Sequence, residues 1–121
     1  MSQASAATID YVEFPVSDTA ALQQTKTFYQ TVFGWQYKQW GEDYVDTTDS
    51  GIGSGLTADS TQSGRSALVV VRVDDLEQAW QAVQDAGGVI VHDIFAFPGG
   101  RRFHFTDPAG NELAVWSPDS P

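Results

Sequence analysis

The chain has 121 residues, a length that fits one domain. It contains no cysteine, which excludes disulfides, thiolate nucleophiles and metal sites built on Cys. Six Lys and Arg residues against sixteen Asp and Glu residues give a formal net charge of −10. An acidic surface repels phosphate backbones and anionic lipids, so we expect neither nucleic acid nor a membrane as a partner.

The ends of the sequence carry no recognisable targeting signal. Residues 1–7 lack the basic segment and the apolar run of a secretory signal. The longest apolar stretch, residues 67–71, is too short to span a bilayer. We therefore expect a cytoplasmic protein with flexible tails at residues 1–7 and 118–121.

The first half predicts a strand, a helix and three further strands. Residues 9–16 alternate between apolar and other side chains, which indicates a strand. Asp18 is a suitable N-cap for a helix that runs to about residue 32, and Gly34 ends it. Strands are expected at residues 35–40, 44–47 and 51–56.

The second half repeats this order after a polar linker at residues 57–66. Residues 67–73 predict a strand, and Asp74 with Glu77 has the spacing of a capping box. The helix that follows ends at Gly87, and strands are expected at residues 89–91, 101–106 and 112–116. The helix of the first half is longer by about one turn.

This internal repeat predicts an α+β fold made of two tandem βαβββ modules. The modules span residues 8–56 and 67–117, within a single domain that spans residues 8–117.

Several short segments carry a resemblance to a known family. They are VEFPVSD at residues 12–18, VFGW at 32–35, VDDL at 73–76, AGG at 86–88 and DPAGNELAVW at 107–116. In their order and spacing they resemble the vicinal oxygen chelate superfamily, which includes glyoxalase I, bleomycin-resistance proteins and extradiol dioxygenases. The resemblance implies curled mixed sheets that form an open cup, a ligand site in the cup, and pairing as a homodimer.

The resemblance also assigns four positions to the metal ligands of relatives, which are usually His, Glu or Gln. In this sequence they fall on Tyr11, Gly53, Leu68 and Ala114. A phenol is a poor neutral ligand, and the other three side chains offer no lone pair. We therefore predict no metal at these positions and no cofactor. A divalent metal elsewhere is the alternative.

Strand alternation selects the candidate ligand-binding residues. They are Tyr11, Glu13, Tyr44, Arg102, His104, Glu112 and Trp116. Glu13 and His104 are the candidate catalytic residues, because His titrates near neutral pH and a carboxylate can hold its tautomer. Glu13, His104 and Glu112 together are the alternative metal set. The structural interpretation is that His104 hydrogen-bonds a neighbouring carboxylate and that Arg101 and Arg102 pair with acidic residues.

Two features of the sequence weigh on the function. No helix follows the glycines of residues 51–55, although a phosphate-binding loop requires one. Because glycine has no side chain, these residues are expected to leave open space on one face of a strand. Aromatic side chains are abundant enough to stack a planar ligand. The leading hypothesis is a metal-independent small-molecule binding protein, with an aromatic or cationic ligand. The alternatives are a lyase, isomerase or dioxygenase-type enzyme that uses His104 and Glu13, and a protein-interaction module.

Overall fold

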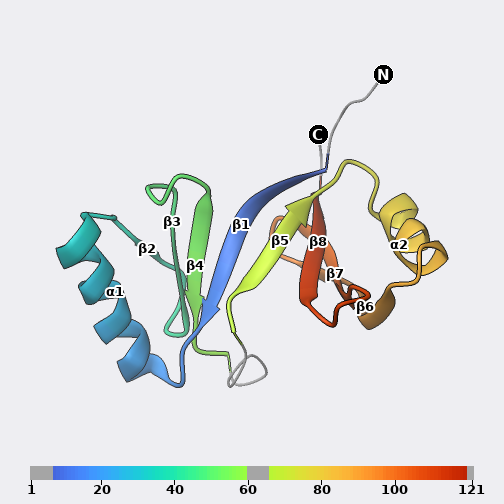
Figure 1. Ribbon diagram of the computed structural model, residues 1–121. Coiled ribbons are helices and arrows are strands. Elements are labelled where there is room, and N and C mark those ends of the chain that lie inside the picture. Colours follow the sequence, from blue (N-terminus) through green and yellow to red (C-terminus); the bar gives the residue numbers. More distant parts are fainter. Residues whose placement is uncertain (1–6, 60–65, 120–121) are drawn as a thin grey trace. The chain divides into compact units, whose positions relative to one another are not determined.

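The computed structural model describes residues 7–59 and 66–119 (Figure 1). Its contacts divide the chain into two compact units. Tyr11–Leu68 form the N-terminal unit, and the C-terminal unit begins at Val69 and also includes residues 7–10. The predicted linker and tails fall largely on residues 1–6, 60–65 and 120–121, which lie outside the described residues.

The N-terminal unit follows the predicted order of elements. They are β1 (Thr8–Pro15), α1 (Thr19–Phe33), β2 (Lys38–Gln39), β3 (Tyr44–Thr47) and β4 (Gly53–Thr57). The strands lie in the order β2-β3-β4-β1. β4 is parallel to β1 and antiparallel to β3, and β3 is antiparallel to β2.

The C-terminal unit repeats that arrangement. Its elements are β5 (Leu68–Arg72), α2 (Leu76–Asp85), β6 (Val89–Phe97), β7 (Gly100–Thr106) and β8 (Glu112–Pro118). The strand order is β5-β8-β7-β6, with β8 parallel to β5 and antiparallel to β7. The predicted α+β fold of two βαβββ modules is confirmed. α1 has 15 residues and α2 has 10, so the first helix is longer by one turn, as predicted.

Each helix covers one face of the strands of its own unit. In the N-terminal unit Leu22 of α1 packs with Val45 and Leu56. In the C-terminal unit Leu76 of α2 packs with Phe103 and Val115. The opposite face of each set of strands is thereby left for other side chains, because successive residues of a strand alternate between its faces.

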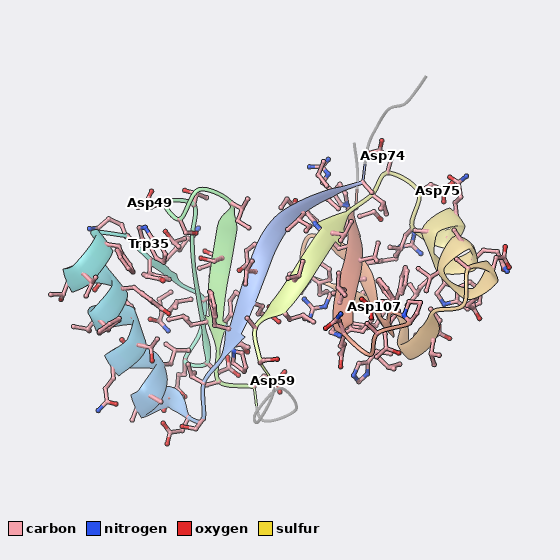
Figure 2. The ribbon with its side chains drawn as sticks, in the orientation of Figure 1. Trp35, Asp49, Asp59, Asp74, Asp75 and Asp107 are labelled. Carbon is pink, nitrogen blue, oxygen red and sulfur yellow. The ribbon has the colours of Figure 1, made fainter. Side chains whose placement is uncertain are left out.

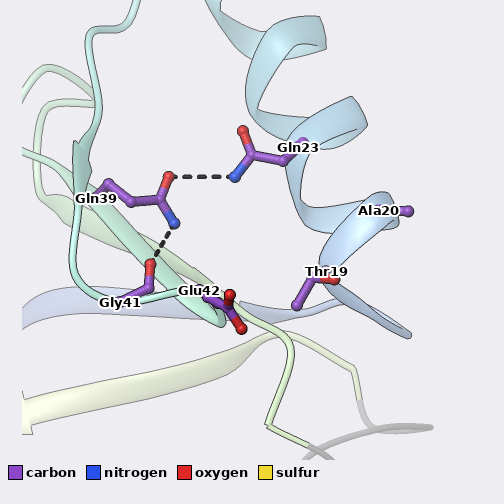
Figure 3. Close-up of a pocket in the computed structure, with 6 residues that line it drawn as sticks. All are labelled: Thr19, Ala20, Gln23, Gln39, Gly41 and Glu42. Atoms are coloured by element: carbon purple, nitrogen blue, oxygen red, sulfur yellow. Dashed lines mark hydrogen bonds between the residues drawn. The ribbon is translucent and has the colours of Figure 1, made fainter.

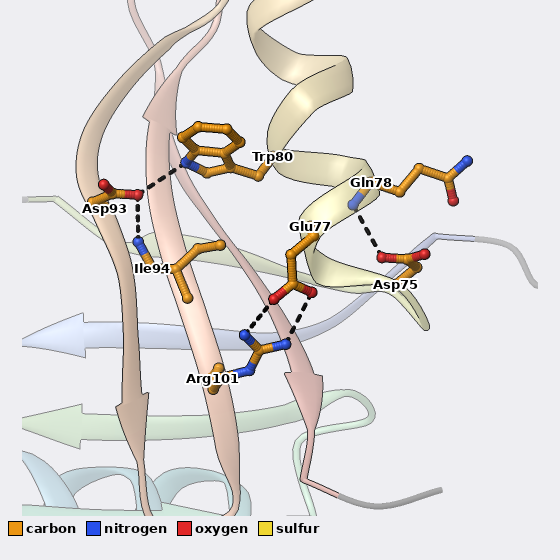
Figure 4. Close-up of polar contacts among 7 residues, drawn as sticks. All are labelled: Asp75, Glu77, Gln78, Trp80, Asp93, Ile94 and Arg101. Atoms are coloured by element: carbon orange, nitrogen blue, oxygen red, sulfur yellow. Dashed lines mark hydrogen bonds and ion pairs between the residues drawn. The ribbon is translucent and has the colours of Figure 1, made fainter.

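The helix ends confirm one predicted cap and correct another. Asp18 caps α1 by accepting a 2.7 Å hydrogen bond from the backbone N–H of Ala21, and Gly34 ends the helix at φ 76°. At α2 the cap is Asp75, which accepts a 3.0 Å hydrogen bond from the backbone N–H of Gln78 (Figure 4). The prediction of Asp74 was wrong by one residue.

Glu77 explains the difference at α2. A capping box needs a side chain in the first turn that reaches back to the cap. Glu77 instead forms a two-pronged ion pair with Arg101 of β7, at 2.5 and 3.0 Å (Figure 4). Asp74 and Asp75 lie side by side just before the helix (Figure 2), but only the Asp75 side chain accepts a hydrogen bond from the first turn.

Strand boundaries differ from prediction mainly at two places. β2 covers only Lys38–Gln39 of the expected residues 35–40. β6 extends from Val89 to Phe97, whereas the prediction stopped at residue 91. Its pairing with β7 shifts register between Ile90 and His92 and again between His92 and Phe95. β8 ends at Pro118 and β4 ends at Thr57, so these strands extend by one residue into the predicted tail and linker.

No helix among the described residues has the length and apolar character needed to cross a bilayer.

Exchanging Asp75 for Ala is expected to reduce the free energy of unfolding by about 0.5–2 kcal/mol, because the first turn of α2 loses its hydrogen-bonded cap. Asp74→Ala removes the same charge from the neighbouring position and is the matched control, with an expected change within about 0.5 kcal/mol. Urea unfolding followed by circular dichroism measures both. Equal losses in the two variants would show that charge, and not the cap, is responsible.

Candidate functional site

A cluster of three polar side chains lies in the N-terminal unit. Tyr11 and Glu13 are two residues apart on β1 and therefore share a face, and Tyr44 opens β3. The Tyr44 hydroxyl donates a hydrogen bond to Oε2 of Glu13 at 3.2 Å, and the hydroxyls of Tyr11 and Tyr44 are also hydrogen-bonded. Because the Tyr44 proton goes to Glu13, Tyr11 is the donor to Tyr44. The three groups thus form a directed chain that ends on a carboxylate that is 7% exposed.

Gly55 of β4 makes room for this chain. A Cβ atom at Gly55 would collide with the hydroxyls of both Tyr11 and Tyr44. The sequence predicted that the glycines of this segment empty one face of a strand so that ligand or backbone can approach. Gly55 leaves this space free of a side chain of its own, as predicted. The hydroxyls of Tyr11 and Tyr44 occupy the space, so it is not open to a ligand.

The environment of Tyr44 holds its phenol neutral. Burial raises the pKa of Tyr44 far above its ordinary value of 10.0, and the negative charge of Glu13 and the neighbouring Tyr11 act in the same direction. The hydroxyl therefore remains a hydrogen-bond donor throughout the physiological pH range.

The C-terminal unit holds a second cluster on the face opposite to α2. His92 of β6 lies opposite His104 of β7, with ring centroids 5.0 Å apart and ring planes at 82°. Nδ1 of His104 lies 3.0 Å from Oε2 of Glu112 on β8. His104 is 1% exposed, the Glu112 side chain is 21% exposed and His92 is exposed. The predicted hydrogen bond between His104 and a neighbouring carboxylate is confirmed.

That hydrogen bond sets the proton on His104. A carboxylate only accepts, so Nδ1 carries the hydrogen and Nε2 presents a lone pair. Burial lowers the pKa of His104, and electrostatic repulsion by Arg102 and the neighbouring ring of His92 also lowers it, against the opposing effect of the hydrogen bond to Glu112. Nε2 is buried and has no hydrogen-bond partner among the described residues.

A row of aromatic and cationic side chains continues along the same face. Arg102 lies opposite Trp116 on β8 and opposite Phe95 on β6. Its guanidinium carbon is 5.5 Å from the ring centroid of Phe95 and 5.8 Å from that of Phe97. Trp116 lies 6.1 Å from Phe97 and donates a 3.1 Å hydrogen bond from Nε1 to Asp10, which fixes the plane of its indole. We call Phe95, Phe97, Arg102 and Trp116 the aromatic row.

The side chains of Arg101 and Arg102 point to opposite faces of β7. Arg101 points to α2 and pairs with Glu77, which is the predicted structural pairing with an acidic residue (Figure 4). Arg102 points to the other face and packs within the aromatic row. Strand alternation had favoured Arg102 as the functional candidate, and the structure places it beside Trp116.

The structure groups the predicted site residues into two sets. Tyr11, Glu13 and Tyr44 meet in the N-terminal unit, and Arg102, His104, Glu112 and Trp116 share one face of the C-terminal unit. Glu13 and His104 belong to different units. Their pairing as catalytic residues, and the metal set that includes Glu13, therefore stay predictions.

Sequence reasoning missed His92, Phe95 and Phe97. All three lie on the part of β6 beyond residue 91, which was not predicted as a strand. The one available signal was the rarity of histidine. The chain has two, and two copies of a rare residue type can be expected to share a site.

The four positions that the resemblance assigns to a metal do not fit one. Tyr11 lies in register with Gly53, and its phenol is hydrogen-bonded to Tyr44. Leu68 and Ala114 are buried hydrocarbon side chains. This donor set lacks the nitrogen and carboxylate ligands that divalent ions require, so no step of a mechanism runs through a metal at these positions.

A surface hollow of about 520 Å³ lies between α1 and the β2–β3 turn (Figure 3). Its lining residues are Thr19, Ala20, Gln23, Gln39, Gly41 and Glu42. All six are exposed, and Gln39 bridges the hollow by bonding Gln23 and the backbone of Gly41 (Figure 3). It contains no buried polar group, so it is not the candidate site.

Comparisons with known proteins agree with this fold. The family model described as the Glyoxalase/Bleomycin resistance protein/Dioxygenase superfamily matches residues 8–115. A search of the curated proteins finds no match.

Among solved structures, one similar chain is titled NAD-dependent benzaldehyde dehydrogenase from Legionella pneumophila, at 16% identity and TM-score 0.71, covering 90% of this chain and 98% of that one. Another is methylmalonyl-CoA epimerase from Mycobacterium tuberculosis, at 16% identity and TM-score 0.69, covering 100% and 94%. A third is the Mn(II)-bound glyoxalase from Novosphingobium aromaticivorans, at 21% identity and TM-score 0.64, covering 93% of this chain and 40% of that one. At these identities the likeness shows the fold alone.

Stability at alkaline pH is expected to report the buried Tyr44. An unfolded tyrosine ionises near pH 10, whereas folded Tyr44 stays neutral. Below that pH both states carry the Tyr44 proton, so Tyr44 does not affect the free energy of unfolding. Above that pH the folded state holds one more proton than the unfolded state. Above it the free energy of unfolding falls, by up to about 1.4 kcal/mol per pH unit.

Tyr44→Phe removes this term and should flatten the decline relative to the parent protein. Urea unfolding from about pH 8 to about pH 11 measures it. Tyr37→Phe is the comparison variant: burial also raises the pKa of Tyr37, but no carboxylate adds to the shift, so this variant should flatten the decline less than Tyr44→Phe. Parallel curves for the parent and Tyr44→Phe would contradict the burial of a neutral phenol.

Proposed function

Because the chain belongs to the glyoxalase/bleomycin resistance protein/dioxygenase superfamily, we propose that it binds a small molecule, and that the aromatic row of the C-terminal unit holds a planar ligand bearing an anionic group. Members of this superfamily bind small molecules and are often dimers. The observation that carries the proposal is the guanidinium of Arg102, which lies close to the rings of both Phe95 and Phe97 and opposite Trp116.

The chemistry of the row supports a planar ligand. Aromatic rings provide a flat apolar surface at little cost in conformational entropy. Phe95 is 41% exposed although it lies on a face that also contains buried side chains, so part of this surface is open to solvent. The indole of Trp116 is held by its hydrogen bond to Asp10 and offers a preoriented ring.

The charge of the aromatic row favours an anionic ligand over a cationic one. Arg102 lies inside the row, and Arg72 lies 5.8 Å from the Trp116 ring. A guanidinium has several N–H donors in a planar fork that matches a carboxylate. The aromatic part of the sequence-based hypothesis is therefore kept. The cationic part is not carried forward, because two guanidinium groups lie at this face.

This binding does not call on a metal at the four positions that relatives use, because those side chains cannot ligate one. The enzyme alternative requires Glu13 and His104 to act together and stays a prediction. The interaction-module alternative also stays a prediction. Pairing as a homodimer is part of the proposal, and sedimentation equilibrium of the purified chain measures it.

Binding of 2-naphthoate, an aromatic carboxylate, tests the proposal by isothermal titration calorimetry. The same ring bearing a methylammonium group is the matched ligand and should bind more weakly. Arg102→Gln is expected to weaken naphthoate binding at least about 10-fold, because the charged partner of the carboxylate is lost.

Arg101→Gln is the control variant for that measurement. It removes the same charge from the neighbouring residue, which faces α2, and should leave naphthoate affinity within about 2-fold while lowering stability. If the two arginine variants lose affinity equally, or if the cationic ligand binds better, the proposed binding face is wrong.

A further inference from the structure

The two histidines of the chain lie next to each other in the folded structure. His92 and His104 are opposite residues on β6 and β7, although the sequence gives them no motif spacing. Their rings are 5.0 Å apart, and Glu112 of β8 approaches His104 from the next strand at 3.0 Å. Three adjacent strands thus each contribute one side chain with a metal-ligating atom.

The spacing of these atoms suits a metal ion. One nitrogen from each histidine and one carboxylate oxygen all lie within 4.8 Å of one another. Bonds from Zn²⁺ to nitrogen and oxygen ligands are about 2.0–2.2 Å, which places neighbouring ligands roughly 3–3.5 Å apart. The 3.0 Å hydrogen bond from Nδ1 of His104 to Oε2 of Glu112 leaves Nε2 as the ring nitrogen of His104 that an ion can use. His92 is exposed, and a rotation of its side chain closes the remaining gap.

A second observation points to a ligand at His104. Its bond to Glu112 satisfies one ring nitrogen, but Nε2 is buried without a partner among the described residues. A buried polar atom left without a partner is costly, and such atoms are uncommon in folded proteins. A purely structural His–Glu pair does not account for this lone pair.

We propose that His92, His104 and Glu112 form a binding site for a divalent transition-metal ion. Two imidazoles with one carboxylate favour Zn²⁺, Co²⁺, Ni²⁺ or Cu²⁺ over Mg²⁺ and Ca²⁺, which prefer oxygen ligands alone. The two imidazole nitrogens leave positions on the ion for water or for a small molecule. Glu112 is the carboxylate that accepts the hydrogen bond from Nδ1 and so orients the His104 ring toward the ion.

The site is different from the four positions that relatives use. Ala114, the last of those positions, lies opposite His104 on β8 and offers no ligand. The proposed ion is therefore held by the strand beside it and by the edge strand beyond. The inference is independent of the proposed small-molecule binding, because none of its three residues belongs to the aromatic row.

Titration of the untagged protein, after chelator treatment, with ZnCl₂ and CoCl₂ in excess MgCl₂ tests this. The excess Mg²⁺ occupies weak sites on the acidic surface. We expect one ion per chain by calorimetry. Zn²⁺ should shift the ring resonances of both histidines together, and the spectrum of His92→Ala assigns each of the two.

His92→Ala is the decisive variant, since an exposed side chain can be removed without disturbing the core. It should weaken Zn²⁺ binding at least about 10-fold. Glu112→Gln should also weaken it, whereas Glu42→Gln, which removes the same charge from an exposed position of the other unit, should not.

Several results would overturn the site. They are an unchanged affinity in His92→Ala, equal losses in Glu112→Gln and Glu42→Gln, or histidine resonances that do not respond to Zn²⁺. Circular dichroism of each variant verifies that it is folded, and His92→Ala keeps the test valid even if changes at the buried His104 prevent folding.

Discussion

Burial of Phe103 beneath α2 fixes the face that every residue of β7 presents. Phe103 is fully buried with Leu76 and Val115, so its two neighbours must point to the other side. Those neighbours are Arg102 and His104, which face Trp116 and Glu112 of β8. A shift of one residue would bury the guanidinium under the helix and expose the phenyl ring, which makes the register strongly specified. Both candidate sites of the C-terminal unit depend on this one packed side chain.

Much of this arrangement could be predicted from the sequence, because it follows from local rules. Alternation along residues 101–106 separates Arg102 and His104 from Phe103, and the repeat of strand, helix and three strands predicts the order of both units. A cap residue is set by backbone geometry and competing contacts, so the choice between Asp74 and Asp75 could not be made. The pair between Glu77 and Arg101 joins residues 24 apart in the sequence and has no local signature.

The two units share one topology and differ in chemistry. In each, the first strand is parallel to the fourth, and the helix covers one face. The N-terminal unit uses that shared frame for a neutral phenol chain ending on Glu13, with Gly55 providing space. The C-terminal unit uses it for imidazole, guanidinium and indole. Contacts such as Tyr44 with Glu13 depend on strand pairing, and sequence alternation alone does not supply the partner.

The irregular pairing of β6 has a consequence for how this face can change. Ile90 and Ile94 pack with the core, while His92 and Phe95 face the other side, so strict alternation fails twice within six residues. Each failure is an extra residue that bulges from the strand. Loss of the single residue Asp93 would therefore remove the second bulge and restore regular alternation from His92 to Phe95. Phe95 and Phe97 would keep their face, so a gap of one at this place in an alignment would mark a relative with a regular strand and the same binding face.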